Sequence, residues 1–395
     1  MDGSSPYGSD GGTPAGLREA GAAHDPFGWY DERRRTGAVH YDPEREVYDV
    51  FTHEHVKAAL QDDDALVRKP LSREEGAHTP FAYLDEAMVW SDGPEHTASK
   101  HQFFEFFRPD RLRALRGSIR EIADDQFEVA RRDGPEFDFV AAFARPVPLR
   151  VVMDLVGVPR DDQGRVLTWL ETFREVMNSE HSAAESGEGE RMAEAVDYLA
   201  DLVARRRADP ADDLVSRLVE ETTLDDATIG ANCFDFLLAG QGTMTEHLSN
   251  ALYLLDDHDL FADFDEYDLD VVLEEVLRYR APLQARARET TRPVTIAGTT
   301  IPAGETVVLW IGAANRDPAR YDAPEEFRPT RDPDHLAFGT GPHTCIGAPL
   351  ARLEAPIVLR AFAERVDELG VDLDAAVPKA KASKTGFERL PVSIR

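Results

Sequence analysis

The sequence predicts a mostly α-helical fold with a small β portion, and three observations support this. Apolar residues recur at helical spacing through most of the chain. Short alternating or apolar runs, typical of strands, are confined to residues 47–50 and 294–310. Hydrophobic residues make up 42% of the 395, which is enough to bury a sizeable core. The chain is therefore expected to be globular.

The elements follow in order from these patterns. Val47-Tyr48-Asp49-Val50 alternates like a strand, and a helix is expected directly after it. The strands at 294–296 and 307–310 are separated by turn residues, Gly298 and Pro302-Ala303-Gly304. Apolar spacing predicts helices over 54–60, 112–130, 148–156, 166–177, 195–203, 229–255, 269–280 and 348–365.

The chain is expected to hold one domain. Residues 1–24 are rich in Gly, Ser, Pro and Ala, which favours a flexible tail. No internal repeat or linker interrupts the chain after residue 24. We therefore expect a single domain over residues 25–395.

The charge balance excludes several kinds of partner. The 44 basic and 75 acidic residues give a net charge of −31, which disfavours binding to nucleic acid or to anionic lipid. No apolar run reaches the ~18–20 residues of a membrane span. Only six of the basic residues are Lys, and many acids with few lysines indicate a halophilic source. A GC-rich genome also explains the excess of Arg, but it does not explain the charge.

The cysteines and the N-terminus indicate a location. Two cysteines, Cys233 and Cys345, do not make a disulfide framework. The N-terminus has no basic region followed by an apolar core, so no secretory signal is predicted. A cytoplasmic location is expected.

The most informative segment is Phe338-Gly-Thr-Gly-Pro-His-Thr-Cys-Ile-Gly347. Its glycines let the backbone turn sharply and approach a flat group closely. Cys345 comes just before a helix that begins at Ala348-Pro349, and a helix N-terminus stabilises a thiolate. Such a thiolate suits an axial ligand of haem iron. Two alternatives stay open here: a buried, inert Cys, and a zinc site, although a second close ligand pair is missing.

This segment resembles the haem-binding loop of the cytochromes P-450, and the resemblance extends from about residue 25 to the C-terminus. It implies a triangular prism of helices around haem b, with Cys345 as the thiolate ligand of the iron. Phe338 matches the aromatic residue beside the sulfur, and Gly347 matches the last glycine of the loop.

A second motif supports the resemblance. Glu275-Val-Leu-Arg278 places a carboxylate and a guanidinium on one helix face. Alone, such a pair is usually a surface feature. In the family it is buried and joined by an Arg from the coil before the haem loop, and Arg331 matches that Arg. The resemblance implies that the three hold the cysteine loop in place.

The resemblance also implies partners for the haem propionates. Asp92-Gly-Pro-Glu-His96 matches a family segment, and Lys100 stands where the family usually has Arg. Arg288 matches the Arg that enters the β region, and His343 is the fourth candidate. Each of these residues alone also fits a solvated surface position.

The segment Leu237-Leu-Ala-Gly-Gln-Gly-Thr-Met-Thr-Glu246 matches the family's central helix. Ala239 and Gly240 leave room beside the iron, or else serve close helix packing. Thr243 supplies a hydroxyl near bound oxygen. The usual acid before this Thr is replaced by Gly242. Glu246, one turn on, is a candidate substitute, as is Gln241 acting through water.

The substrate pocket follows from family positions alone. The residues at these positions are mostly apolar, which favours a lipophilic substrate, although each also fits an ordinary core. They are Leu84, Met88, Val89, Trp90, Phe236, Leu283, Gln284 and Phe387.

The resemblance predicts a monomeric haem-thiolate monooxygenase. It would take electrons from a ferredoxin served by a ferredoxin reductase, and insert one atom of O₂ into a small lipophilic molecule. Gly242 keeps open a peroxide-driven or rearranging haem-thiolate enzyme. A haem-based sensor is a third possibility, although no extra partner-binding segment is visible in the sequence.

Overall fold

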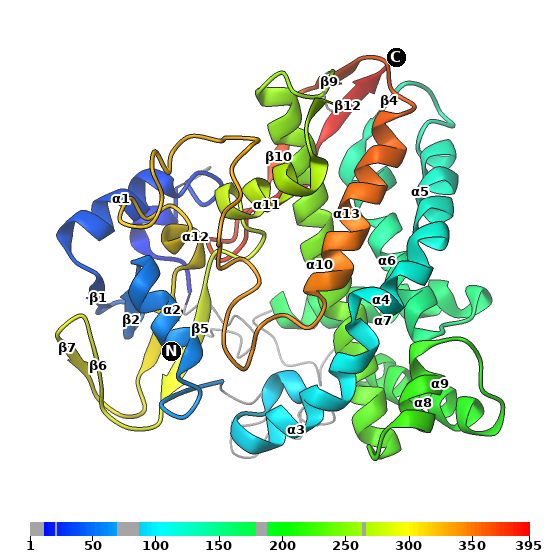
Figure 1. Cartoon of the computed structure of the whole chain (residues 1–395), viewed down its shortest axis with the longest axis horizontal. Coiled ribbons are helices and arrows are strands. Elements are labelled where there is room, and N and C mark those ends of the chain that lie inside the picture. The colour runs from blue at the N-terminus through cyan, green and yellow to red at the C-terminus, as the bar shows by residue number, and fades with distance from the viewer. Residues whose placement is uncertain (1–11, 20–21, 69–86, 179–187, 263–265) are drawn as a thin grey trace. The chain divides into compact units, whose positions relative to one another are not determined.

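The computed structural model describes residues 12–19, 22–68, 87–178, 188–262 and 266–395 (Figure 1). The chain forms two compact units. Unit 1 holds residues 67–108 and 149–241, and unit 2 holds residues 10–66, 109–148 and 242–395. Helices α6 (Pro146–Val156) and α10 (Asp226–Asp257) each run from one unit into the other. The single domain expected over residues 25–395 stays a prediction.

Unit 1 is helical, as the apolar spacing predicted. The long helices are α7 (Gln163–Asn178) and α8 (Glu188–Ala208). Helix α9 (Leu214–Glu221) begins after Asp213, whose carboxylate accepts the Ser216 backbone N–H at 2.8 Å, an N-cap bond. The remaining elements are η3 (Met88–Trp90), α3 (Gly93–Phe104), η4 (Glu105–Phe107) and η7 (Arg160–Asp162).

Unit 2 contains the sheets. The largest has the strand order β1-β2-β8-β5-β3. Strand β2 pairs with β8 in parallel, and β5 pairs with β8 antiparallel. The bounds are β1 (Val39–Asp42), β2 (Val47–Val50), β3 (Leu66–Val67), β5 (Arg286–Thr290) and β8 (Thr306–Leu309). The predicted strands at 47–50 and 307–310 are confirmed in this sheet.

Three smaller sheets complete the β portion of unit 2. Strands β6 (Val294–Ile296) and β7 (Thr299–Ile301) form a hairpin, as do β10 (Val377–Pro378) and β11 (Phe387–Arg389). A three-stranded sheet has the order β4-β12-β9, with β4 (Glu136–Asp138), β12 (Pro391–Ile394) and β9 (Leu369–Val371).

The helices of unit 2 pack around an aromatic core. Helices α5 (Arg116–Ala130) and α13 (Ala348–Ala363) lie side by side (Figure 1). Phe362 of α13 meets the ring of Phe127 at 5.6 Å and that of Phe139 at 5.1 Å. The others are η1 (Ala15–Leu17), α1 (Phe27–Thr36), α2 (His53–Gln61), α4 (Pro109–Leu112), η5 (Arg113–Leu115), η6 (Val140–Ala144), α11 (Leu269–Tyr279) and α12 (Ile311–Ala314).

Part of the expected tail is packed. Leu17 and Ala23 are buried in one cluster with Tyr30 and Trp310. For the described residues before Asp25, the expectation of a flexible tail therefore needs correction, because these apolar side chains have a core to pack against. No helix among the described residues has the length and hydropathy needed to cross a bilayer.

Candidate functional site

The cysteine loop closes on itself and passes tightly over α2. The Cys345 N–H donates to the Phe338 carbonyl at 2.8 Å, and Thr344 Oγ1 donates to the Gly341 carbonyl at 2.7 Å. Gly341 has a φ of +74°, and a Cβ there would lie 2.8 Å from the Leu60 carbonyl oxygen. Only Gly fits such a position. The loop geometry thus depends on the glycine pattern that the sequence showed.

The two cysteines have opposite surroundings. Cys345 is exposed, and its carbonyl accepts the Ala348 N–H at 3.3 Å at the start of the 16-residue helix α13. Cys233, on α10, is fully buried, and burial raises the pKa of its thiol. Exposure and a place before a helix N-terminus favour Cys345 as the ligand or nucleophile.

The predicted support trio comes together beneath the loop. Arg278 donates from Nε and Nη2 to the Glu275 carboxylate at 2.7 and 2.8 Å, and both side chains are completely buried. Arg331 Nε donates to Glu275 Oε1 at 3.1 Å. Arg278 also donates to the carbonyls of Asn315, Pro324 and Glu326. The trio therefore fixes the coil that leads into the cysteine loop.

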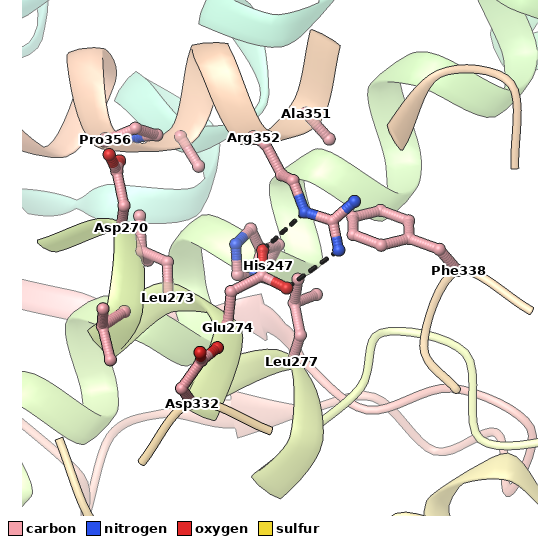
Figure 2. Close-up of a pocket in the computed structure, with 12 residues that line it drawn as sticks. His247, Asp270, Leu273, Glu274, Leu277, Asp332, Phe338, Ala351, Arg352 and Pro356 are labelled. Carbon is pink, nitrogen blue, oxygen red and sulfur yellow. Dashed lines mark hydrogen bonds and ion pairs between the residues drawn. The ribbon is translucent and has the colours of Figure 1, made fainter. Parts of the chain in front are cut away.

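Four residues that the sequence reading missed link this network to the loop. Asn315 is buried, and its Oδ1 accepts the Leu336 N–H at 2.8 Å. Arg352 of α13 donates to Glu274 at 2.7 and 2.9 Å, and its guanidinium lies 4.6 Å from the Phe338 ring centre (Figure 2). His335 Nε2 lies 3.0 Å from Glu274 Oε2. The sequence offered one sign of these four residues, which was that Glu274 directly precedes Glu275 of the predicted trio.

The electrostatics of this cluster favour an ionised Glu274. Burial raises the pKa of its carboxyl, but hydrogen bonds from Arg352 and His335 outweigh burial and lower that pKa to about 2. The bonds to Glu274 in turn raise the pKa of Arg352, and the Cys345 sulfur contributes to that shift. Arg352 therefore stays positively charged, and it stacks on Phe338, the aromatic residue that begins the loop.

On α10, small residues leave one face open. Ala239, Gly242 and Thr243 fall at positions i, i+3 and i+4 of the helix. Ala239 is exposed, and a Cβ on Gly242 would meet nothing within 4 Å. Gly240 differs, because a Cβ there would lie 3.3 Å from Val152 of α6. Close packing thus accounts for Gly240, while the open face carries the Thr243 hydroxyl.

Glu246 has partners that the sequence did not predict. It is completely buried, and its Oε1 lies 3.2 Å from Lys379 Nζ and 3.6 Å from Lys384 Nζ. A Cβ on Gly386 would lie 2.9 Å from Glu246 Cγ, so the backbone of the C-terminal segment presses on this side chain. Glu246 therefore ties α10 to residues 379–386.

Comparison with known proteins identifies the family. The family model for cytochrome P450 matches residues 268–367. The chain is 33% identical over 385 residues to a putative cytochrome P-450 123 of Mycobacterium tuberculosis, covering 94% of each protein. This chain belongs to the cytochrome P-450 family.

Further relatives agree. The 6-deoxyerythronolide B hydroxylase of Saccharopolyspora erythraea is 32% identical, with 94% of this chain and 96% of the relative covered. Substrate-free CYP109E1 from Bacillus megaterium matches with a TM-score of 0.86 and 30% identity, covering 94% and 99% of the two chains. The P-450 fold and a monooxygenase activity are thus confirmed. The expected halophilic source gains no support from these relatives.

A P-450 carries a haem-thiolate cofactor, and the residues at Cys345 fit one. The thiol is exposed at a helix N-terminus, within a loop that a glycine brings close to α2. Gly347 has an ordinary φ of −78°, and a Cβ there would lie 3.9 Å from Cys345 Sγ, so a side chain would stand beside the sulfur. The assignment of Gly347 and Phe338 to cofactor binding stays a prediction.

Of the four residues predicted to bind the haem propionates, two belong to unit 1 and two to unit 2. In unit 1, His96 and Lys100 lie one turn apart on α3, and His96 is buried. In unit 2, Arg288 of β5 is buried and donates to the Ala287 carbonyl at 2.8 Å, while His343 is half-buried in the cysteine loop. All four stay predictions, each with a side chain able to bond a carboxylate.

Several predicted pocket residues have other partners. Gln284 is fully buried, and its Oε1 accepts the Tyr30 hydroxyl at 2.9 Å. Phe387 is buried, with its ring 5.1 Å from that of His24. Phe236 is buried and packs on Phe103. The assignment of these three residues to the substrate pocket stays a prediction.

The other pocket candidates are less constrained. Met88 is buried, and its N–H donates to Asn232 Oδ1 at 3.0 Å, while Val89 and Trp90 are half-buried. Leu283 is half-buried and pairs with Lys384 in an isolated β-bridge. Leu84 lies outside the described residues. Met88, Val89, Trp90 and Leu283 stay predictions.

Proposed function

We propose that this cytochrome P-450 hydroxylates a small lipophilic molecule, with O₂ as the oxygen source and electrons from a ferredoxin that a ferredoxin reductase reduces. The names of related proteins support the substrate class: relatives hydroxylate erythromycin at C-12 and 6-deoxyerythronolide B. CYP109E1 from Bacillus megaterium has been solved in complex with testosterone and with corticosterone. These molecules have in common that they are small and lipophilic, and the proposal for this chain goes no further than that class.

The observation that carries the proposal is the exposed Cys345 at the N-terminus of α13. Haem bound there supplies the binding and activation of O₂. Cys345 Sγ would bind the iron, and the trio of Glu275, Arg278 and Arg331 would hold the coil that leads into the loop. The resemblance to the family makes His96, Lys100, Arg288 and His343 the residues that would bind the propionates.

Proton supply is where this chain departs from its family. Gly242 has no side chain to relay a proton, and Glu246 is engaged with two lysines. The space beside Gly242 is open. We therefore propose that water entering beside Gly242 delivers protons to the Thr243 hydroxyl, and that Glu246 positions the C-terminal segment.

Carbon monoxide difference spectra test whether Cys345 is the thiolate ligand of the haem iron. The reduced carbonyl complex of the wild type is expected to absorb well to the red of a histidine-ligated haem. Cys345→Ala should lose this signature, and Cys233→Ala is the matched control that should keep it. A histidine-type spectrum in the folded wild type contradicts the proposal.

The proton route is tested by measuring product, NAD(P)H consumption and peroxide release. Gly242→Asp should raise product per NAD(P)H, since the new side chain has room, and Glu246→Gln should leave it unchanged. General acid–base assistance is worth ~10²–10⁴-fold, so a route through Glu246 would show as a large loss. That loss would refute the water route.

Gly242 also favours a second candidate, a peroxide-driven or rearranging enzyme, because peroxide brings its own protons. If peroxide alone matches the electron-transfer system in the wild type, this second function replaces the first. If peroxide supports only a small fraction of the turnover, the monooxygenase proposal stands.

A further inference from the structure

Glu274 of α11 and Arg352 of α13 form an ion pair beside the start of the cysteine loop, and the proposed mechanism does not use it. Arg352 donates from Nε and Nη2 to the two carboxylate oxygens at 2.7 and 2.9 Å, which is the bidentate geometry of a strong pair. Burial raises the pKa of Glu274, but hydrogen bonds from Arg352 and His335 lower it to about 2. Both members of the pair are therefore charged near neutral pH.

The positive end of this pair faces the cysteine loop. The guanidinium lies between the Glu274 carboxylate and the Phe338 ring, and its central carbon is 4.6 Å from the ring centre (Figure 2). A cation over an aromatic face at this distance is attracted by the ring. The Phe338 carbonyl accepts the Cys345 N–H at 2.8 Å. Arg352 therefore contacts the residue on which the loop closes.

His335 ties the same pair to the chain just before the loop. Its side chain is 2% exposed, and its Nδ1 accepts the Ala337 N–H at 3.2 Å. Since Nδ1 accepts, Nε2 carries the ring hydrogen and donates it to Glu274 Oε2 at 3.0 Å. The His335 ring also lies 5.9 Å from the Phe338 ring. Glu274 thus holds the start of the loop from two sides, through His335 and through Arg352.

The charge of Arg352 is felt at the sulfur of Cys345. Glu274 raises the pKa of Arg352 most, and the Cys345 thiolate raises it further, so the guanidinium and the sulfur attract each other. Reduction of a bound haem by one electron adds one negative charge at the iron. Charges and hydrogen bonds around the ligands of a metal shift its reduction potential. A cation beside the ligand loop favours the reduced state.

We propose that Arg352 is a positioning residue for the iron ligand, which fixes Phe338 at the start of the cysteine loop and keeps a positive charge beside it. Glu274 and His335 hold the guanidinium in this place. The inference rests on the proposed function, in which Cys345 binds the haem iron.

The reduction potential of the haem-loaded full chain tests the charge. It is measured by dithionite titration at about 0.1 M KCl, where the Debye length is ~10 Å. Arg352→Gln leaves Glu274 ionised without its cation and should lower the potential. Glu274→Gln leaves the guanidinium without its anion and should raise the potential. Both variants break the same pair, so a purely structural role would shift the potential in one direction, and that outcome would overturn the proposal.

The carbonyl spectrum tests the position of the loop. In mild urea, Arg352→Gln should lose the thiolate-type spectrum about fivefold faster than the wild type, because a bidentate pair and a cation–π contact are lost. Arg352→Lys keeps the charge but neither the fork nor the planar stack. It should therefore keep the wild-type potential and still lose the spectrum faster. A wild-type lifetime of the spectrum in Arg352→Lys would contradict the positioning role.

Arg120→Gln is the matched control. Arg120 of α5 donates to Asp124 at 2.8 Å and to Glu364, at the C-terminal end of α13, at 2.7 Å. Its side chain is 36% exposed, so the variant removes a comparable cation but no contact with Phe338. The potential and the lifetime of the spectrum should match the wild type. Equal changes in Arg120→Gln and Arg352→Gln would reduce the effect to the overall charge of the chain and overturn the proposal.

The wild-type spectrum separates this inference from the proposed function. A histidine-type carbonyl spectrum in the wild type means that Cys345 is not the ligand, and both then fail. A thiolate-type spectrum in the wild type, with an unchanged potential and lifetime in Arg352→Gln, supports the proposed function and overturns the role of Arg352.

Discussion

Removing the Arg278 side chain should destabilise unit 2 more than any change at a surface ion pair. Arg278 makes five hydrogen bonds, two to Glu275 and three to backbone carbonyls, and its side chain is 0% exposed. In Arg278→Ala, the buried Glu275 carboxylate keeps the Arg331 guanidinium and the Arg328 N–H as its only donors among the described residues. The three carbonyls lose their donor.

Breaking one side of a buried pair costs about 3–5 kcal/mol, because the remaining charge is left without compensation. A protein of this kind has a total stability of about 5–15 kcal/mol, so the loss is a large fraction. Arg328→Ala is the matched control. Its ion pairs to Asp322 and Glu326 are exposed, and such pairs are worth about 0–1 kcal/mol.

The assay is urea unfolding followed by circular dichroism, together with haem content per protein. Arg278→Ala should unfold at much lower urea and lose haem, while Arg328→Ala should behave like the wild type. If Arg278→Ala does not fold, Arg331→Ala gives a milder test. Its side chain is 13% exposed and donates once to Glu275, so an intermediate loss is expected. Equal midpoints for Arg278→Ala and Arg328→Ala would refute the reasoning.

Three further predictions follow from charge and packing. The midpoint temperature should rise with KCl to molar concentration, because a net charge of −31 repels itself at low salt and the Debye length falls to ~3 Å at 1 M; a flat response would contradict this. Burial raises the pKa of Glu354 to about 8. This carboxyl is therefore protonated when folded and ionised when unfolded between about pH 4.5 and 8, so stability is lost as pH rises. Glu354→Gln should equal the wild type at pH 4 and exceed it at pH 8 in urea melts. Gly386→Ala should cost about 1–3 kcal/mol because its Cβ meets Glu246, whereas Gly242→Ala, with open space, should stabilise α10 by about 0.5–1 kcal/mol. Equal melts for these two variants would contradict the packing argument.

Local patterns were enough to predict most of the elements. Strand β2 and helices α10, α11 and α13 lie within a few residues of their predicted bounds, because periodicity and turn residues act over short distances. The loop from Phe338 to Gly347 resembles the haem-binding loop of the family, and that resemblance named Cys345 as the candidate thiolate ligand. The positive φ of residue 341 requires glycine, and the glycine is visible in the sequence itself.

The partners of individual side chains were decided only by tertiary structure. Glu246 meets Lys379 and Lys384 from more than 130 positions away, and no periodicity encodes such a pairing. Gln284 and Phe387, two of the predicted pocket residues, contact Tyr30 and His24 of the N-terminal segment, and no local pattern showed these contacts. Burial and ion pairing depend on which distant segments the folded chain brings together. The sequence therefore indicated the family and most of the elements and named Cys345 as the candidate iron ligand, whereas the folded chain alone determined which distant polar groups pair with one another.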